Sequence, residues 1–326
     1  MKQIVLEAPG RFTEREVPAP IAAAGQALVR MEKVGVCGSD FHAFAGSHPI
    51  YTYPRIIGHE LSGVVVEAPA NEKGIQSGDR CAIEPYMSCG KCRACAMGRN
   101  NCCENIRLLG VHVDGGMQEF LSVPLVLLHK SNRLSLDQLA LVETLGIGAH
   151  AVIRSGLKEG EAALIVGAGP IGIAVAQFAA AMGAKVHMVE KNEWRRAFVE
   201  GMGYTASLTP EDRQADAVFD ATGSAVAMGN SLAQVATGGR LVYVGLTRDP
   251  VCIDDSLFHR KEVTLLASRN SHGQFPRIIE LIEEGKIDTS HWVTDRLRLS
   301  EVASQFQFLP TRQTLIKAIV DVNGLG

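Results

Sequence analysis

Length, composition and charge indicate a globular chain with two domains. The chain has 326 residues, of which 46% are hydrophobic and 21% charged, and its formal net charge is -3. This length suits two domains, and the slightly negative charge argues against a nucleic-acid partner. The charged N-terminal segment lacks a signal-peptide pattern, and glycines interrupt the most apolar stretch, 162–182, so we expect no membrane span and a cytoplasmic protein.

The first half of the chain consists of short apolar segments separated by glycine and proline. Segments with the length or alternation typical of strands are 26–36, 61–68, 78–85 and 116–124. Short strands with frequent turns favour a compact, antiparallel, barrel-like domain over a parallel sheet.

Near Gly146 the pattern changes to an alternation of strands and helices. Predicted strands are 162–169, 185–190, 216–223, 240–246 and 262–268, and the predicted helices between them are 171–184, 195–203 and 227–239. This alternation predicts an α/β fold with a doubly wound parallel sheet. A helix over 276–287 and a strand over 315–322 follow, and we expect this tail to pack on the first domain.

A glycine motif marks a nucleotide site in the second half. Gly167, Gly169 and Gly172 form G-x-G-x-x-G directly after a strand and at the start of a helix. Such glycines allow a tight turn, close approach of pyrophosphate to the backbone, and packing of helix on strand. Glu190 ends the next strand, where a carboxylate accepts hydrogen bonds from ribose hydroxyls and repels a 2′-phosphate.

These features predict NAD in preference to NADP. Two observations keep alternatives open. Arg195 and Arg196 lie close enough in sequence to offset the repulsion of a 2′-phosphate. Glycine-rich turns are also common without a nucleotide, so a structural turn with a surface glutamate is the simpler alternative.

Four cysteines predict a metal site that holds a lobe at about 86–106. Cys89, Cys92, Cys95 and Cys103 supply four thiolates, and zinc bound by four sulfurs has no open position for a substrate. An iron–sulfur cluster is less favoured because no proline follows Cys103, as it does in ferredoxin-type runs. A redox dithiol and a lobe without metal are further alternatives, and Cys102 is a candidate to replace Cys103 as the fourth ligand.

A second, dispersed set contains a cysteine, a histidine and two glutamates. Cys37 lies in GVCGSDFH, His59 and Glu60 in IIGHE, and Glu143 in LVETLG. Each alone has an ordinary structural explanation, such as a small core thiol. Together they form a mixed donor set that can hold zinc and keep one position for water or an alcohol.

Four motifs in order resemble the zinc-dependent medium-chain dehydrogenases. They are GVCGSDFH, YPRIIGHE, CGKCRACAMGRNNCC and GAGPIG, and the similarity extends over essentially the whole chain. Within this family the chain is most similar to the polyol and sugar-acid branch, which includes sorbitol and threonine dehydrogenases. The segments 98–124 and 265–270 are most similar to the L-galactonate 5-dehydrogenase group. Classical alcohol dehydrogenases place a cysteine where Glu143 stands.

The resemblance implies a fold and a set of site residues. The fold is a GroES-like catalytic domain, 1–147 and 271–326, with a Rossmann NAD-binding domain, 148–270. Two zinc ions per chain are implied: a structural one on the four cysteines, and a catalytic one on Cys37, His59 and Glu143, with Glu60 adjacent or exchanging. Ser39 and His42 match the family's proton relay. The expected cofactor-binding residues are Gly167, Gly169, Pro170, Ile171, Gly172, Glu190, Arg195, Thr222, Gly245 and Arg269.

The implied activity is oxidation of a secondary alcohol to a ketone with hydride transfer to NAD. We expect a small hydroxylated substrate, first a sugar acid, then a polyol or sugar, then threonine. Candidate contacts to it are His48, Arg55, Arg269 and Asn270. The rivals are a metal-free quinone or enone reductase and a non-catalytic NAD-binding regulatory protein.

The resemblance also predicts subunit association and one local departure. Relatives form dimers or tetramers partly through Rossmann edge strands, for which 240–246 and 262–268 are suited. Only about a dozen residues separate Gly203 from Asp216, so we predict that one crossover helix is shortened or lost.

Overall fold

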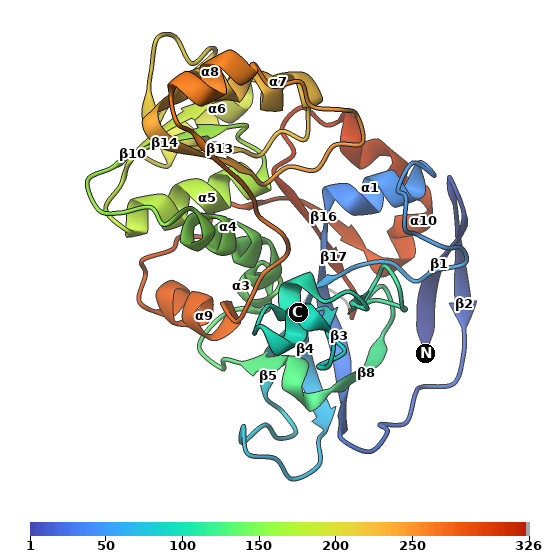
Figure 1. The fold of residues 1–326 in the computed structure, drawn as a ribbon. Coiled ribbons are helices and arrows are strands. Elements are labelled where there is room, and N and C mark those ends of the chain that lie inside the picture. Colours follow the sequence, from blue (N-terminus) through green and yellow to red (C-terminus); the bar gives the residue numbers. More distant parts are fainter. Residues whose placement is uncertain (324–326) are drawn as a thin grey trace. The chain divides into compact units, whose positions relative to one another are not determined.

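The computed structural model describes residues 1–323, and the chain forms two compact units (Figure 1). The first unit joins Met1–Glu143 to the segment that begins at Phe275, and the second is Thr144–Gln274. Helix α4 (Val142–Ser155) contains the boundary. None of the helices within 1–323 combines the length and apolar character that a membrane crossing needs.

A mostly antiparallel sheet forms the centre of the first unit. Its order is β16-β17-β3-β4-β5-β9, and β8 also pairs with β3. The strands are β3 (Gln26–Val36), β4 (Glu60–Glu67), β5 (Arg80–Ile83), β8 (Phe120–Pro124), β9 (Leu128–Lys130), β16 (Val293–Arg298) and β17 (Lys317–Asp321). β16 and β17 are parallel, whereas β17 runs antiparallel to β3, so the tail completes the N-terminal sheet.

The register of three neighbouring strands determines where the site forms. Ala318 of β17 faces Val36 of β3, and Gly35 of β3 faces Glu60 of β4. The residues that end β3 therefore lie between the first residues of β17 and β4.

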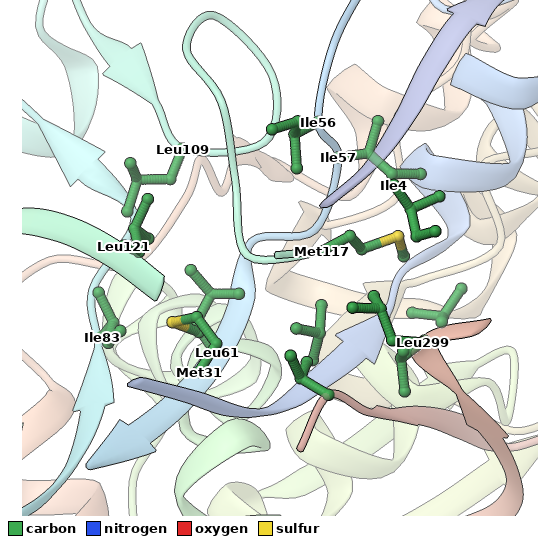
Figure 2. Close-up of a cluster of buried hydrophobic side chains, with 14 of the residues drawn as sticks. Ile4, Met31, Ile56, Ile57, Leu61, Ile83, Leu109, Met117, Leu121 and Leu299 are labelled. Atoms are coloured by element: carbon green, nitrogen blue, oxygen red, sulfur yellow. The ribbon is translucent and has the colours of Figure 1, made fainter. Parts of the chain in front are cut away.

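The core of the first unit packs against this sheet. Ile4, Met31, Ile57 and Met117 are fully buried, and Figure 2 shows them in one cluster with side chains from both chain segments. β3 alternates buried Ala27, Val29 and Met31 with more exposed neighbours, as a strand with one face on a core requires. Each large buried aliphatic side chain contributes about 1.5–3 kcal/mol relative to its exposed state.

Short elements complete the first unit. They are β1 (Lys2–Ala8), β2 (Arg11–Glu16), α1 (Gly38–Phe44), β6 (Tyr86–Met87), α2 (Arg93–Ala96), β7 (Arg107–Leu108), α3 (Leu136–Ala140), α9 (Phe275–Glu283) and α10 (Val302–Gln305). Single 3-10 turns cover Asn100–Cys102, Leu125–Leu127, Leu299–Glu301 and Phe306–Thr311.

The second unit is a doubly wound parallel sheet, as the alternation of elements predicts. Its order is β12-β11-β10-β13-β14-β15, with every neighbouring pair parallel. The strands are β10 (Ala162–Val166), β11 (Lys185–Val189), β12 (Thr205–Ser207), β13 (Ala215–Asp220), β14 (Val235–Tyr243) and β15 (Thr264–Ala267). The helices are α5 (Pro170–Ala181), α6 (Glu193–Gly201), α7 (Ala225–Asn230) and α8 (Asp255–Arg260), and α5 and α8 lie on opposite sides of the sheet (Figure 1).

One predicted helix, 227–239, is wrong in its second half. α7 ends at Asn230, a 3-10 turn covers Ser231–Gln234, and strand β14 begins at Val235. Val235 pairs with Ala215 and is fully buried in the sheet core. A β-branched pair followed by two glycines, VATGG, disfavours a helix, and burial of Val235 decides for the strand.

The prediction that one crossover helix is shortened or lost is confirmed, since the helix is absent over 208–214. Between β12 and β13 the chain covers 208–214 with bends and turns only. The doubly wound order is kept, but this connection contributes a loop rather than a helix.

Candidate functional site

Cys37, His59 and Glu60 meet at the ends of adjacent strands in the first unit. Cys37 follows β3 and is the N-cap of α1, and Glu60 opens β4 opposite Gly35. One ligand atom from each of the three residues lies within 4.8 Å of the others. His59 and Glu60 are buried, and Cys37 is half-buried.

Lys317 of β17 reaches across the end of β3 and holds Glu60 of β4 in place. Its Nζ donates to both carboxylate oxygens of Glu60, at 2.6 and 2.7 Å, and to the backbone oxygen of Val36 at 3.3 Å. Both side chains are at most 2% exposed. Gly35 makes room for this pair, because a Cβ on residue 35 would lie 2.1 Å from Glu60 Oε2.

Gly35→Ala is therefore expected to force the Glu60 carboxylate out of its position. We expect a loss of about 1–3 kcal/mol in the free energy of unfolding, typical of overpacking a buried site. Urea unfolding measures it, with Gly201→Ala as the control, since a Cβ at residue 201 in α6 meets nothing within 4 Å. Equal destabilisation by both variants would contradict the role of Gly35.

A buried carboxyl group, Asp40, lies beside His59. Asp40 Oδ2 accepts from the backbone N–H of Cys37 at 2.9 Å, and Asp40 Oδ1 lies 3.7 Å from His59 Nδ1. Burial raises the pKa of Asp40. Burial opposes the charged form of His59, but Asp40 and Cys37 outweigh it and raise its pKa well above the usual value. Ser39 Oγ lies 3.5 Å from His59 Nε2.

Glu143 enters the same region from the first turn of α4. It is buried, and its Oε1 accepts a hydrogen bond from the hydroxyl of Tyr86. Burial raises the pKa of Glu143, and the charge of Glu60 adds to that effect. Glu143 is thus near enough to interact with His59 and Glu60, although it is outside the tight set of three.

The charges of this region suit a divalent cation. Asp40, Glu60 and Glu143 are each at most 5% exposed, and Lys317 is the only buried lysine or arginine within 1–323. An excess of buried negative charge is costly unless a cation compensates it. Thiolate, imidazole and carboxylate are the ligands of catalytic zinc sites, so the residues present fit a zinc ion.

The four-cysteine lobe has the geometry of a closed zinc site. Cys89, Cys92, Cys95 and Cys103 bring their Sγ atoms within 4.8 Å of one another, with Cys92 Sγ 3.5 Å from Cys95 Sγ and 3.8 Å from Cys103 Sγ. Thiolates around one zinc ion with Zn–S bonds of about 2.3 Å lie about 3.8 Å apart, which fits these spacings. Backbone N–H groups of Lys91 and Cys92 lower the pKa of Cys89 to about 6, which favours its thiolate.

The fourth position belongs to Cys103 rather than Cys102 in this geometry. Cys103 is buried and its Sγ accepts from the backbone N–H of Cys89 at 3.2 Å. Cys102 is exposed and outside the set of four. The 3-10 turn Asn100–Cys102 points successive side chains in different directions, so only one of the two neighbours can face the lobe.

The second unit contains a cavity of about 920 Å³ at the carboxyl ends of its strands. Of the predicted cofactor residues, Gly167, Gly169, Glu190, Arg195 and Thr222 line it. This is where the strand order reverses between β10 and β13, the usual place for a dinucleotide in such folds.

The other predicted cofactor residues lie outside the cavity lining. Pro170 and Ile171 open α5, and Gly172 packs so closely that a Cβ there would lie 1.8 Å from the Gly167 carbonyl oxygen. Gly245 contacts Gly223 in the same way, with 2.4 Å from such a Cβ to Gly223 N. Arg269 follows β15 and is not among the lining residues.

Glu190 connects the glycine loop to the next turn. Its Oε2 accepts from the backbone N–H of Ala168 at 2.7 Å and its Oε1 from that of Asn192 at 2.8 Å. Arg196 donates to the backbone oxygens of Glu190 and Lys191, so of the two arginines it is Arg195, with Lys191, that faces the cavity.

Among the candidate substrate contacts, Arg55 is already engaged. It donates to Asp114 at 3.0 Å and to Thr52 at 3.1 Å. His48 packs edge-on against Tyr51, whose hydroxyl lies 3.5 Å from Asp40. His42 is exposed on α1, with Nδ1 3.2 Å from Ser47 Oγ.

Asp40, Tyr86 and Lys317 are site residues that the sequence reasoning missed. Asp40 lies inside the GVCGSDFH motif, and its spacing to Cys37 is a capping-box signal. Tyr86 and Lys317 carry no local signal, because only strand pairing and burial bring them to the site.

Comparisons with known proteins agree over the whole chain. Residues 23–133 match the alcohol dehydrogenase GroES-like domain, and residues 170–284 match the zinc-binding dehydrogenase family. L-galactonate-5-dehydrogenase of Escherichia coli strain K12 is 35% identical, with 98% of each chain covered. 2-dehydro-3-deoxy-L-galactonate 5-dehydrogenase of Pseudoalteromonas atlantica is 34% identical, with 92% of each covered.

A solved structure is also similar to this chain over nearly its whole length. The NADP-bound structure of a protein described as a zinc-binding dehydrogenase, from Sinorhizobium meliloti 1021, superimposes with a TM-score of 0.93 at 30% identity, covering 98% of this chain and 99% of that one. These matches confirm the GroES-like and Rossmann fold. The chain therefore belongs to the zinc-binding alcohol dehydrogenases, a family of oxidoreductases that act on CH–OH groups.

Proposed function

We propose that this enzyme oxidises a secondary hydroxyl group of a sugar acid to a ketone and transfers the hydride to NAD. The observation that carries the proposal is the set of half-buried Cys37 with buried His59 and Glu60, and Ser39 Oγ beside it. Two relatives named for galactonate derivatives support the substrate class.

The proposed site residues have two functions: some bind a metal ion and others transfer a proton. Cys37, His59 and Glu60 or Glu143 would hold a catalytic zinc ion, and Cys89, Cys92, Cys95 and Cys103 a structural one. Bound zinc supplies Lewis acidity that lowers the pKa of a hydroxyl group, and NAD supplies the hydride acceptor. Ser39 Oγ would accept the hydroxyl proton while its own proton leaves toward His42, which is one turn further along α1, is exposed, and exchanges protons with water.

A substrate screen tests this proposal. Purified enzyme is incubated with NAD and with aldonates, polyols or L-threonine, and NADH absorbance is followed. We expect the highest kcat/KM with an aldonate. A clear preference for polyols would change the assigned substrate class from sugar acids to polyols. No turnover with any of the three substrate types would contradict the proposal.

Glu190 is proposed to select NAD over NADP. Glu190→Gln removes the charge that repels a 2′-phosphate but keeps a hydrogen-bond acceptor for the glycine loop. We expect the ratio of NADP to NAD affinity to rise by about tenfold or more, since like charges in contact cost several kcal/mol. Fluorescence titration with both nucleotides measures the ratio, with Glu200→Gln on the exposed side of α6 as control. An unchanged ratio of NADP to NAD affinity in Glu190→Gln would show that Glu190 does not determine the cofactor preference.

For the expected homodimer or homotetramer, β15 is the proposed contact strand. Of the two strands expected to associate, β15 is at the edge of the six-stranded sheet and β14 is internal, so β15 is the one with a free side for pairing. Its Leu265 is 37% exposed, which suits an apolar contact between subunits.

A further inference from the structure

Tyr86 has one end in the cysteine lobe and the other at the catalytic residues. Its ring packs in a small buried cluster with Cys103 and Ile106, and the half-buried Cys89, Cys92 and Cys95 pack against the same cluster. Its hydroxyl donates to Glu143 Oε1. Tyr86 is 8% exposed and belongs to β6, which pairs with β7, with Tyr86 opposite Leu108.

This contact fixes one of the two oxygens of Glu143. A tyrosine hydroxyl has a single proton to donate, and here it goes to Oε1. Because Oε1 of Glu143 is held by this hydrogen bond, the carboxylate group cannot rotate freely. The direction in which its second oxygen, Oε2, points is therefore fixed as well. Carboxylates at metal centres depend on such outer hydrogen bonds for their orientation.

The ring and the hydroxyl have different tasks because they contact different groups. The ring contributes apolar packing to the lobe, where the backbone of β6 and β7 also holds it. The hydroxyl contributes nothing to that packing, since its partner is on α4. Removing the hydroxyl alone should therefore leave the lobe intact and release only Glu143.

We propose that Tyr86 is a positioning residue that orients Glu143 toward the catalytic metal and anchors it to the four-cysteine lobe. This inference rests on the proposed function, in which Glu143 belongs to the metal centre. It also assigns a task to the closed cysteine site, which has no position for a substrate. The lobe holds the ring of Tyr86, and through it the orientation of a carboxylate in the catalytic centre.

Tyr86→Phe tests the proposal, because phenylalanine keeps the ring and removes the hydroxyl. The zinc-loaded enzyme is titrated with a chromophoric chelator, which reports the affinity of each zinc ion, and its melting temperature, kcat and KM are measured. We expect the zinc ion of the proposed catalytic centre, the more weakly held of the two, to bind about 10–100-fold less tightly in Tyr86→Phe. The value of kcat should fall by a similar factor. The second zinc affinity, the melting temperature and KM should stay close to the wild-type values.

Tyr243→Phe is the matched control. Tyr243 Oη also donates one hydrogen bond, to the backbone oxygen of Met228 at 2.9 Å, but it belongs to the second unit, and both cysteine sets belong to the first. We expect no change in either zinc affinity. A double variant with Glu143→Ala completes the test, since Cys37, His59 and Glu60 still provide three donors.

In the Glu143→Ala background, Tyr86→Phe should lower zinc affinity no further. Equal zinc affinities in the wild type and Tyr86→Phe would overturn the proposal. It would also be overturned if Tyr86→Phe lowered zinc affinity as much in the Glu143→Ala background as in the wild type. A wild-type enzyme that binds zinc but oxidises no alcohol would contradict the proposed function, and the zinc titration would still decide the role of Tyr86.

Discussion

Replacing Cys37 by alanine is expected to lower kcat by about 1000-fold or more, because Lewis-acid stabilisation is worth several kcal/mol and each 1.36 kcal/mol is tenfold in rate. Cys37 is the one sulfur donor in the set with His59 and Glu60. In the proposed mechanism its loss weakens zinc binding, so the substrate hydroxyl group loses the Lewis acid that lowers its pKa. Steady-state kinetics and zinc content per chain measure the effect.

NAD binding should be unchanged in the same variant. The cavity lined by Gly167, Gly169 and Glu190 lies wholly in the second unit, and Cys37 lies in the first. Fluorescence titration checks this. Cys252→Ala is the control for loss of a thiol, since Cys252 is exposed and belongs to neither metal set. Full activity of Cys37→Ala with one zinc ion fewer per chain would contradict the assignment of Cys37 to a catalytic zinc site.

The second large effect is expected for Cys103→Ser. Cys103 is buried among the four sulfurs, so serine would remove a proposed zinc ligand and leave a hydroxyl group in its place. A structural zinc contributes directly to folding free energy. A loss of about 3 kcal/mol corresponds to a fall of roughly 6–12 °C in melting temperature for a domain of this size. Differential scanning calorimetry and zinc content measure it.

Cys102→Ser is the neighbouring control. Cys102 is exposed and takes no part in the set, so we expect wild-type zinc content and melting temperature. The reverse result, with Cys102→Ser losing zinc and Cys103→Ser keeping it, would assign the fourth ligand to Cys102.

The parts of the structure that the sequence predicts are those with a local pattern. Strand β10, the glycine loop and α5 follow from an apolar run, a G-x-G-x-x-G motif and a helical period, and all three are present. The four-cysteine spacing likewise brings its sulfurs together. The failure at 227–239 has a partly local cause, since VATGG already disfavours a helix, and burial of Val235 in the sheet core decides for the strand.

The missed residues depend on contacts between distant segments. Lys317 reaches Glu60 only because β17 lies beside β3 with Ala318 opposite Val36. Neither lysine nor glutamate at those positions shows a pattern of its own. Tyr86 is similar, because a tyrosine next to a cysteine lobe gives no sign of which group its hydroxyl will meet.

The pairing of Lys317 with Glu60 also has a consequence for biosynthesis. The two residues are 257 positions apart in the chain. At about 5–20 residues per second, the ribosome needs roughly 13–50 s to make the second after the first. During that time Glu60 has no lysine partner and β3 lacks its neighbour β17. The Rossmann unit, whose strands all lie between residues 162 and 267, is complete earlier. We therefore expect the nucleotide-binding unit to fold first on the nascent chain, and the proposed catalytic centre to form only after Lys317 has been made.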